Sequence, residues 1–231
     1  MEKIRQIYSL TIILAGDIGV GKTNIVYSYT KKNISSEIEQ TNSKKFFFKN
    51  TKIKGKKIRL QIWELSGQEE LEEINIKSLC SKCHGGFIIY DISQKESFDN
   101  VDFWYSILYE NLPEDSPIIL LGNKSDLDSE RKIPYEDGVK KSEELSISFY
   151  ETCALDKENI NNVFNEILKQ IIEKMEKDKK KPEVVDEEEN KKVTEINEEI
   201  LLQKKEEDID ERKKEYNEKK RKGKNGSCAC C

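Results

Sequence analysis

A glycine-rich segment near the start of the chain has the residue types and the spacing that suit phosphate groups. Gly16–Thr23 reads Gly-Asp-Ile-Gly-Val-Gly-Lys-Thr and fits the pattern G-x-x-x-x-G-K-[ST]. Its glycines let successive backbone N–H groups point at phosphate oxygens, and the helix expected after it adds the positive end of its dipole. We expect Lys22 to bridge the β- and γ-phosphates and the Thr23 hydroxyl to bind Mg²⁺. The residues predicted to contact the phosphates are Gly16, Asp17, Ile18, Gly19, Val20, Gly21, Lys22 and Thr23.

A second polar segment, Asn123–Asp126, has the residue types to recognise a nucleobase. Its sequence Asn-Lys-Ser-Asp fits N-K-x-D and directly follows the apolar run Pro117–Gly122. Ligands of open α/β sheets bind at the carboxyl ends of strands, where this segment is expected to lie. Asp126 can accept from the N1–H and the exocyclic amine of guanine, whereas adenine has no N1–H donor. Four residues alone also fit a polar loop, but with the phosphate loop they predict a guanine nucleotide site read by Asn123, Lys124 and Asp126.

The segments that must position these loops alternate between strand-like and helix-like patterns, as in an open α/β sheet. Mostly apolar runs predict strands at Ile7–Ala15, Phe46–Ile53, Lys57–Trp63, Gly86–Asp91, Pro117–Gly122 and Ile147–Thr152. Helices are expected at Asn24–Tyr29, Ser97–Glu110, Tyr135–Leu145 and Glu158–Met175. The last of them has apolar residues at helical spacing, namely Ile160, Val163, Phe164, Ile167, Leu168 and Ile171. Lys54-Gly55-Lys56 is expected to form a hairpin turn.

Composition divides the chain into a folded domain and a charged tail. Of 231 residues, 35% are hydrophobic and 37% are charged, which is too polar for a uniform globule. Charged residues dominate from Asp178 to Gly223, so we expect a domain over residues 1–177 and a solvated, partly helical tail over residues 178–231. The net charge of −5, from 40 basic and 45 acidic residues, argues against a general nucleic-acid binder.

No secretory signal and no membrane-spanning segment are expected, because no segment approaches ~18 consecutive apolar residues. The six cysteines are therefore expected to be reduced thiols of a cytoplasmic protein. Cys80–His84 fits C-x-x-C-H, a haem attachment pattern, but such attachment belongs to an exported setting, which disfavours it here. A closed zinc site needs four ligands, and His84 is the only histidine in the sequence.

With these motifs placed, the chain resembles the small GTPases of the Ras superfamily and, more narrowly, the Rab family. The resemblance runs from Ile7 to about Met175 and includes the extreme C-terminus. It rests also on the stretches Arg59-Leu60-Gln61-Ile62-Trp63, Gly67-Gln68-Glu69, Tyr90-Asp91-Ile92, Glu96-Ser97-Phe98, Gly122–Leu127 and Glu151-Thr152-Cys153-Ala154. It implies a P-loop small GTPase fold, an α/β fold with a mostly parallel six-stranded sheet and helices on both faces.

The resemblance also implies roles for residues outside the two motifs. The catalytic residues would be Lys22, Thr41 and Gln68, with Thr41 in switch I closing on Mg²⁺ and the γ-phosphate and Gln68 orienting the attacking water. Gly67 in switch II would meet the γ-phosphate through its N–H.

Two further sets of residues follow from the resemblance. The metal site would consist of Thr23, Thr41 and Glu64. The loop Cys153-Ala154-Leu155 would contact the guanine, with the Ala154 N–H near O6.

Several positions depart from the family pattern. Glu64 stands where an aspartate usually holds Mg²⁺ through water, and the longer side chain is expected to alter nucleotide exchange because Mg²⁺ demands near-ideal octahedral geometry. Ile34 replaces the aromatic that flanks the base, and Leu155 replaces a lysine. Asn42–Lys45 in switch I predicts partners different from those of standard Rabs. Ile18 places a bulky apolar side chain beside the γ-phosphate, where it would obstruct an activating protein.

The chain ends in Cys228-Ala229-Cys230-Cys231, preceded by the basic residues Lys219, Lys220, Arg221, Lys222 and Lys224. A metal-binding or accidental cysteine cluster is the alternative, but the resemblance to Rab termini favours two geranylgeranyl groups, assigned to Cys230 and Cys231. Stable membrane anchoring needs two signals, which two lipids would provide. The basic cluster would add attraction to an anionic leaflet. We therefore expect a cytoplasmic protein that cycles onto the cytosolic face of an endomembrane or the plasma membrane.

Taken together, the sequence predicts a monomeric switch that binds GTP or GDP with Mg²⁺, hydrolyses GTP to GDP and regulates vesicle transport. Its expected partners are an exchange factor, an activating protein, effectors and prenyl-carrier proteins, with no nucleic acid among them. Ile18 and Glu64 keep a weakly hydrolysing pseudo-GTPase scaffold open as the main alternative. A Ras- or Rho-like signalling GTPase is a second alternative, and a P-loop ATPase or kinase is a distant third.

Overall fold

The computed structural model describes residues 7–30, 46–65, 73–178 and 184–185. These residues, apart from Val185, belong to one compact unit, Gln6–Val184. The expectations for Ile34, Thr41, Asn42–Lys45, Gly67 and Gln68 and for the C-terminal cysteines and basic cluster lie outside the described residues. The division of the chain near residue 177 stays a prediction.

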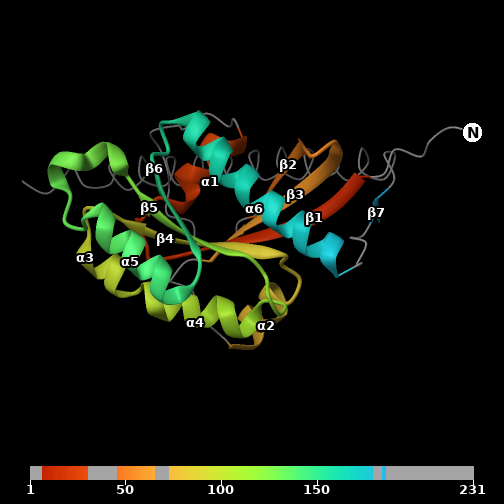
Figure 1. Ribbon diagram of the computed structural model, residues 1–231, viewed down its shortest axis with the longest axis horizontal. Coiled ribbons are helices and arrows are strands. Elements are labelled where there is room, and N and C mark those ends of the chain that lie inside the picture. The colour runs from red at the N-terminus through yellow and green to blue at the C-terminus, as the bar shows by residue number, and fades with distance from the viewer. Residues whose placement is uncertain (1–6, 31–45, 66–72, 179–183, 186–231) are drawn as a thin grey trace, which may run out of the picture. The chain divides into compact units, whose positions relative to one another are not determined.

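A mostly parallel sheet forms the centre of this unit (Figure 1). Its strands are β1 (Ile7–Ala15), β2 (Phe46–Ile53), β3 (Lys56–Glu64), β4 (Gly85–Asp91), β5 (Ile118–Asn123) and β6 (Ser148–Thr152). The order across the sheet is β2-β3-β1-β4-β5-β6, and β2 with β3 is the antiparallel pair while the other neighbours run parallel. A two-residue strand, β7 (Val184–Val185), comes last in the described chain. The expected sheet is confirmed, with boundaries displaced by at most one residue.

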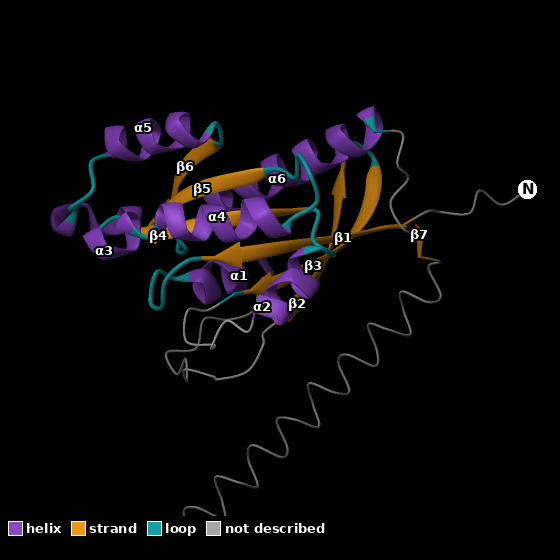
Figure 2. Cartoon of the chain, turned by 90° about the horizontal axis from the view of Figure 1, so that it is seen from below, coloured by secondary structure: helices purple, strands orange, loops and turns teal. Residues whose placement is uncertain are grey.

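Helices cover both faces of the sheet, as Figures 1 and 2 show. The helical elements are α1 (Lys22–Thr30), α2 (Glu73–Cys80), α3 (Lys95–Asp99), α4 (Val101–Asn111), η1 (Ser125–Glu130), α5 (Tyr135–Leu145) and α6 (Lys157–Lys177). Residues of α1 and α6 share one hydrophobic cluster with the sheet, and residues of α2 and α4 share a second. Because both faces are covered, every residue of β4 and β5 is buried, which explains their almost continuous apolar sequence.

The longest helix among the described residues, α6, follows the predicted apolar stripe. All of its stripe residues are buried, from Ile160 to Ile171. The helix begins where the Asp156 side chain accepts hydrogen bonds from the N–H groups of Glu158 and Asn159, both at 3.0 Å. These bonds satisfy amides that have no partner inside the helix, so a single aspartate fixes the start of the element.

The single helix expected over Ser97–Glu110 is wrong, because the structure has two helices there. Asn100 separates α3 from α4 with φ −84° and ψ 0°, outside the helical range. Its side chain is used elsewhere, since Asn100 Nδ2 donates to Asp17 Oδ2 at 2.8 Å. The break therefore brings a polar group of this connection to the phosphate loop, which apolar periodicity cannot reveal. The elements α2 and η1 were not predicted.

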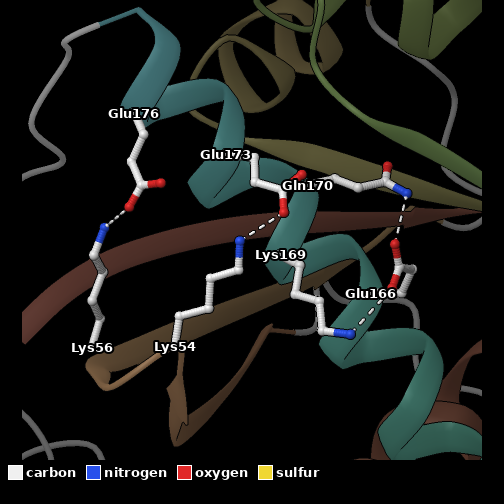
Figure 3. A network of polar contacts seen from close by, with 7 residues as sticks. All are labelled: Lys54, Lys56, Glu166, Lys169, Gln170, Glu173 and Glu176. Carbon is white, nitrogen blue, oxygen red and sulfur yellow. Dashed lines mark hydrogen bonds and ion pairs between the residues drawn. The ribbon is translucent and has the colours of Figure 1, made fainter.

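The β2–β3 hairpin is closed by Lys54 and Gly55, with φ values of 48° and 80°, and Ile53 pairs with Lys56. This left-handed pair is typical of two-residue hairpin turns, so the turn is one residue shorter than expected. Figure 3 shows the hairpin tied to α6 by ion pairs of Lys54 with Glu173, at 2.7 Å, and of Lys56 with Glu176. The hairpin thus contacts the outer surface of the last helix. Within the described part of the chain, no helix combines the length and apolar character needed to span a bilayer.

Candidate functional site

The phosphate loop lies between β1 and α1, as its motif requires. Gly16 and Gly21 have φ values of +147° and +99°, which side-chain-bearing residues rarely adopt. A Cβ atom on Gly16 would lie 2.2 Å from the carbonyl oxygen of Ile89, and one on Gly21 would lie 2.4 Å from Asn123 Nδ2. The loop therefore packs directly against neighbouring strands, and the glycines make that close approach possible.

Lys22 is folded back over this loop. Its Nζ donates to the carbonyl oxygens of Gly16 at 2.6 Å and Asp17 at 2.7 Å, and the residue is 6% exposed. Burial lowers the pKa of Lys22 to about 8, although the carboxylates of Glu64 and Asp17 act in the opposite direction. A buried ammonium held against the backbone of the phosphate loop is well placed to interact with phosphate oxygens.

Thr23 and Glu64, two of the predicted metal-site residues, lie next to each other. The Thr23 hydroxyl donates to Glu64 Oε2 at 2.7 Å. Glu64 is the last residue of β3 and is in register with Leu14 of β1, so the parallel pairing brings it beside the start of α1. A hydroxyl and a carboxylate are oxygen ligands of the kind that Mg²⁺ prefers, and the pair therefore fits this ion chemically.

The base-reading segment is joined to the phosphate loop. Asn123 is 1% exposed, and its Nδ2 donates to the Val20 carbonyl at 2.8 Å. The Thr152 hydroxyl donates to Asn123 Oδ1 at 3.2 Å, which links β6 to the same amide. Lys124 has the left-handed backbone conformation, with φ 66° and ψ 38°, and Asp126 is an exposed residue of the first turn of η1. The amide of Asn123 therefore ties the base-reading segment to the phosphate loop and to the last residue of β6.

The third predicted segment, Cys153-Ala154-Leu155, directly follows β6. The Cys153 Sγ accepts the Leu155 N–H at 3.4 Å, and burial followed by a hydrogen bond with Asp126 raises the pKa of the thiol. Leu155 is 74% exposed. The segment thus meets the base-reading segment at the Cys153–Asp126 contact.

Sequence reasoning missed a second layer of polar residues behind the site. Asp17 accepts from Trp104 Nε1 at 2.7 Å and from Asn100, and Lys124 forms an ion pair with Asp91 at 2.6 Å. Asp91 and Trp104 had no motif of their own. The signals for Asp91 were its place in the stretch Tyr90-Asp91-Ile92, which carries part of the family resemblance, and its position at the carboxyl end of a buried strand, where ligand-binding groups collect.

The Cys80–His84 segment is built into the sheet and its flanking helix. Both thiols are buried, and burial raises the pKa of Cys80 to about 11 and that of Cys83 to about 12. His84 Nδ1 accepts the Thr11 N–H at 3.0 Å, and the backbone N–H of His84 donates to the Thr11 carbonyl at 2.7 Å. Thiols with pKa values this high remain protonated near neutral pH, and His84 extends the pairing of β1 with β4 by one residue. No group of three or more His, Cys, Asp or Glu side chains suited to a metal occurs among the described residues.

Ile18 is 44% exposed on the phosphate loop.

These contacts bring together the described part of the predicted site, from Gly16–Thr23 through Glu64 and Asn123–Asp126 to Cys153. Thr41, Gly67 and Gln68 lie outside the described residues.

Comparisons with known proteins agree with this geometry. A model of the Ras family matches residues 11–173, a span that contains both loops. Ras-related protein RABA2c of Arabidopsis thaliana is 36% identical over 164 residues, which are 71% of this chain and 75% of that protein. Ras-related protein Rab-11B of Dictyostelium discoideum is 35% identical over 179 residues, 78% of this chain and 81% of that protein. Ras-related protein Rab-12 of Homo sapiens is 32% identical over 172 residues, 74% of this chain and 70% of that protein.

Proposed function

Because the chain belongs to the Ras family of small GTPases, and within it to the Rabs, we propose that Gly16–Thr23 and Asn123–Asp126 form its guanine nucleotide site. The protein is a Rab-like switch that binds GTP and GDP with Mg²⁺, hydrolyses GTP to GDP and regulates vesicle transport. Exchange factors, activating proteins and effectors act on switches of this family.

One observation carries the assignment of the site residues. Asn123 Nδ2 donates to Val20 O, so the base-reading segment is anchored to the phosphate loop itself. A nucleotide that spans the two segments is then held by parts that move together, which lowers the entropy lost on binding. Asp126 supplies the guanine specificity, because adenine would leave its carboxylate without a partner.

The reaction chemistry is distributed over residues that lie close together and others outside the described ranges. Lys22 holds positive charge against the phosphates, while Thr23 and Glu64 offer oxygen ligands to Mg²⁺, which neutralises the charge that develops on the phosphate oxygens. We assign Gln68 to orienting the attacking water, Thr41 to closing over the γ-phosphate and Gly67 to contacting it. Because catalysis here is positioning and charge stabilisation, unaided turnover is expected on the order of 10⁻⁴ s⁻¹.

Two measurements on the full chain test the site. Asp126→Ala should remove most of a guanine-over-adenine preference of ~10⁴, measured by competition of GDP and ADP for the protein. Asp128→Ala, which changes a neighbouring exposed carboxylate paired with Arg131, is the matched control and should keep the preference. An unchanged preference in Asp126→Ala would contradict the assignment.

Single-turnover hydrolysis of bound GTP, with and without an activating domain, tests the roles of Gln68 and Ile18. Gln68→Leu should reduce phosphate release in both conditions. Ile18→Ser should leave the unaided rate within about threefold and increase the response to the activating domain, because the side chain that obstructs access becomes small. If the unmodified chain releases no phosphate, either with or without the activating domain, the pseudo-GTPase scaffold would be favoured.

We also propose that the tail anchors the protein at the cytosolic face of a membrane through geranylgeranyl groups on Cys230 and Cys231, assisted by Lys219, Lys220, Arg221, Lys222 and Lys224. Two lipids give stable attachment where one gives only reversible binding. Mass spectrometry of the C-terminus of the protein from cells should find two lipids. A single lipid on Cys228 with the following residues removed would contradict the proposal.

A further inference from the structure

The strand that lies between the two nucleotide-binding segments ends in a buried carboxylate. In the sheet, β4 lies between β1, which leads into Gly16–Thr23, and β5, which leads into Asn123–Asp126. The last residue of β4 is Asp91, which is 0% exposed and in register with Asn123. A buried carboxylate is costly unless it is paired, so its partners indicate what it stabilises.

Both carboxylate oxygens of Asp91 are engaged. Oδ2 lies 2.6 Å from Lys124 Nζ. Oδ1 accepts from the Ser93 N–H at 2.8 Å and from the Ser93 hydroxyl at 2.7 Å. Burial opposes the ionisation of Asp91, but the bonds from Lys124 and Ser93 outweigh it and hold the pKa below its usual range. The carboxylate is therefore charged and fixed in orientation, with one oxygen directed at Lys124.

Lys124 in turn extends from the base-reading segment towards the phosphate loop. A Cβ atom on Gly21 would lie 3.9 Å from Lys124 Cε, so the lysine stem runs beside the phosphate loop. Its left-handed backbone conformation is uncommon for a residue with a side chain and needs surrounding contacts to hold it. A free lysine side chain would populate many rotamers, and the ion pair with Asp91 selects one of them before any ligand arrives.

We propose that Asp91 is a positioning residue for nucleotide retention, which fixes the Lys124 side chain of the base-reading segment beside the phosphate loop and so slows the release of guanine nucleotide. The inference rests on the proposed nucleotide site. It assigns to β4 a part in binding that neither sequence motif contains.

The test is the release rate of a fluorescent GDP from the full chain in the presence of Mg²⁺. Asp91→Asn keeps the shape and the acceptor for Ser93 but removes the charge that holds Lys124, and it should accelerate release by about 10- to 100-fold. Lys124→Met should also accelerate release, and the double variant should be no faster than Lys124→Met alone, because the two residues act as one unit. Asp99→Asn, the same change in an exposed ion pair with Lys95, is the control and should release GDP within about twofold of the unmodified rate.

A second nucleotide separates positioning from general damage to the site. IDP lacks the exocyclic amine that Asp126 accepts from, so the ratio of IDP to GDP release rates reports base reading alone. We expect Asp91→Asn to keep this ratio within about twofold, because the substitution frees the Lys124 side chain and leaves Asp126, which contacts the amine, in place. The inference would be overturned if the ratio of IDP to GDP release rates fell towards one in Asp91→Asn. It would also be overturned if the fold-changes in release rate of the two single variants multiplied in the double variant. Unchanged release from Asp91→Asn would do the same while leaving the proposed site intact, whereas failure of the unmodified chain to retain GDP would reject the site itself.

Discussion

Two regions of the molecule join distant segments with the same chemical pair, a lysine and a carboxylate, but in opposite surroundings. At the nucleotide site, Lys124 meets an Asp91 side chain that is 0% exposed. On the outer surface, Lys54 meets Glu173 with side chains that are 44% and 51% exposed (Figure 3). Water and salt screen the surface pair, whereas breaking the inner pair leaves a charge without a partner in the protein interior. Burial, more than the identity of the residues, decides which of the two connections controls function.

The same contrast holds for the glycines of the two regions. Gly21 and Gly55 both have positive φ, yet a Cβ atom on Gly21 would collide with Asn123, while one on Gly55 would meet nothing within 4 Å. Substitutions in the two regions can therefore separate backbone strain from loss of contact.

The largest expected effect comes from Gly21→Ala. It combines a strained backbone with displacement of the Asn123 amide, and it should weaken GDP affinity by about 100-fold or more, measured by calorimetry. Gly55→Ala is the matched control, because it has the strain without the collision. It should cost about 1 kcal/mol of unfolding free energy and leave GDP affinity unchanged. Equal losses of affinity in both variants would mean that packing around Gly21 does not matter.

A smaller effect is expected when the Thr23 hydroxyl is removed. Thr23→Ala should lower Mg²⁺ affinity in the GDP complex by about 10-fold or more, seen as faster GDP release at limiting Mg²⁺. Thr30→Ala removes a hydroxyl from the same helix, where it donates to the Val26 carbonyl, and should not change the Mg²⁺ dependence. Excess Mg²⁺ that fails to slow release from Thr23→Ala would indicate damage beyond the metal site.

A modest effect is expected from Trp104→Phe. The change keeps most of the buried ring but removes the Nε1 donor to Asp17, so GDP release should accelerate by about 3- to 10-fold. Phe103→Leu changes a neighbouring aromatic that is 52% exposed and serves as the control. If both variants release GDP at the unmodified rate, the contact between α4 and the phosphate loop is dispensable for retention.

The smallest effects belong to the surface pair. The hydrogen bond from Lys54 lowers the pKa of Glu173, and the paired state therefore stabilises the fold above the unfolded value near pH ~4.3 and is lost as the pH falls through the folded pKa. Titration followed by carbon NMR should find this lowering abolished in about 1 M salt, because the Debye length is then about 3 Å. The lowering at Asp91, which opposes burial and depends on Lys124 and Ser93, should survive the same salt. A salt-insensitive Glu173 would show that the two regions differ less than burial suggests.

Much of the fold can be predicted from the sequence because strands that are buried on both faces are rich in apolar residues. The strands β4 and β5 are apolar up to their last residues, Asp91 and Asn123, and the stripe of α6 identifies its inner face. The two loops follow from motifs whose residues are neighbours in the chain. Their local spacing is part of the chemistry, so it can be recognised without knowledge of the fold.

The polar layer behind the loops could not be predicted in this way. Asp17 and Trp104 are 87 residues apart, and only the crossing of α4 over the sheet brings them together. The break at Asn100 could not be predicted for the same reason, because its side chain donates to Asp17, a distant residue that the local pattern of apolar residues does not reveal. The roles of Thr41, Gly67 and Gln68 stay predictions, because those residues lie outside the described ranges.

The complete burial of β4 and β5 has a consequence for the timing of motion. Amide hydrogens in such strands exchange with solvent only when the whole domain opens, because no smaller opening exposes them. Asp91 and Asn123 are the last residues of these two strands. The floor of the nucleotide site, which these two residues help to form, should therefore keep its shape over many cycles of nucleotide binding and release.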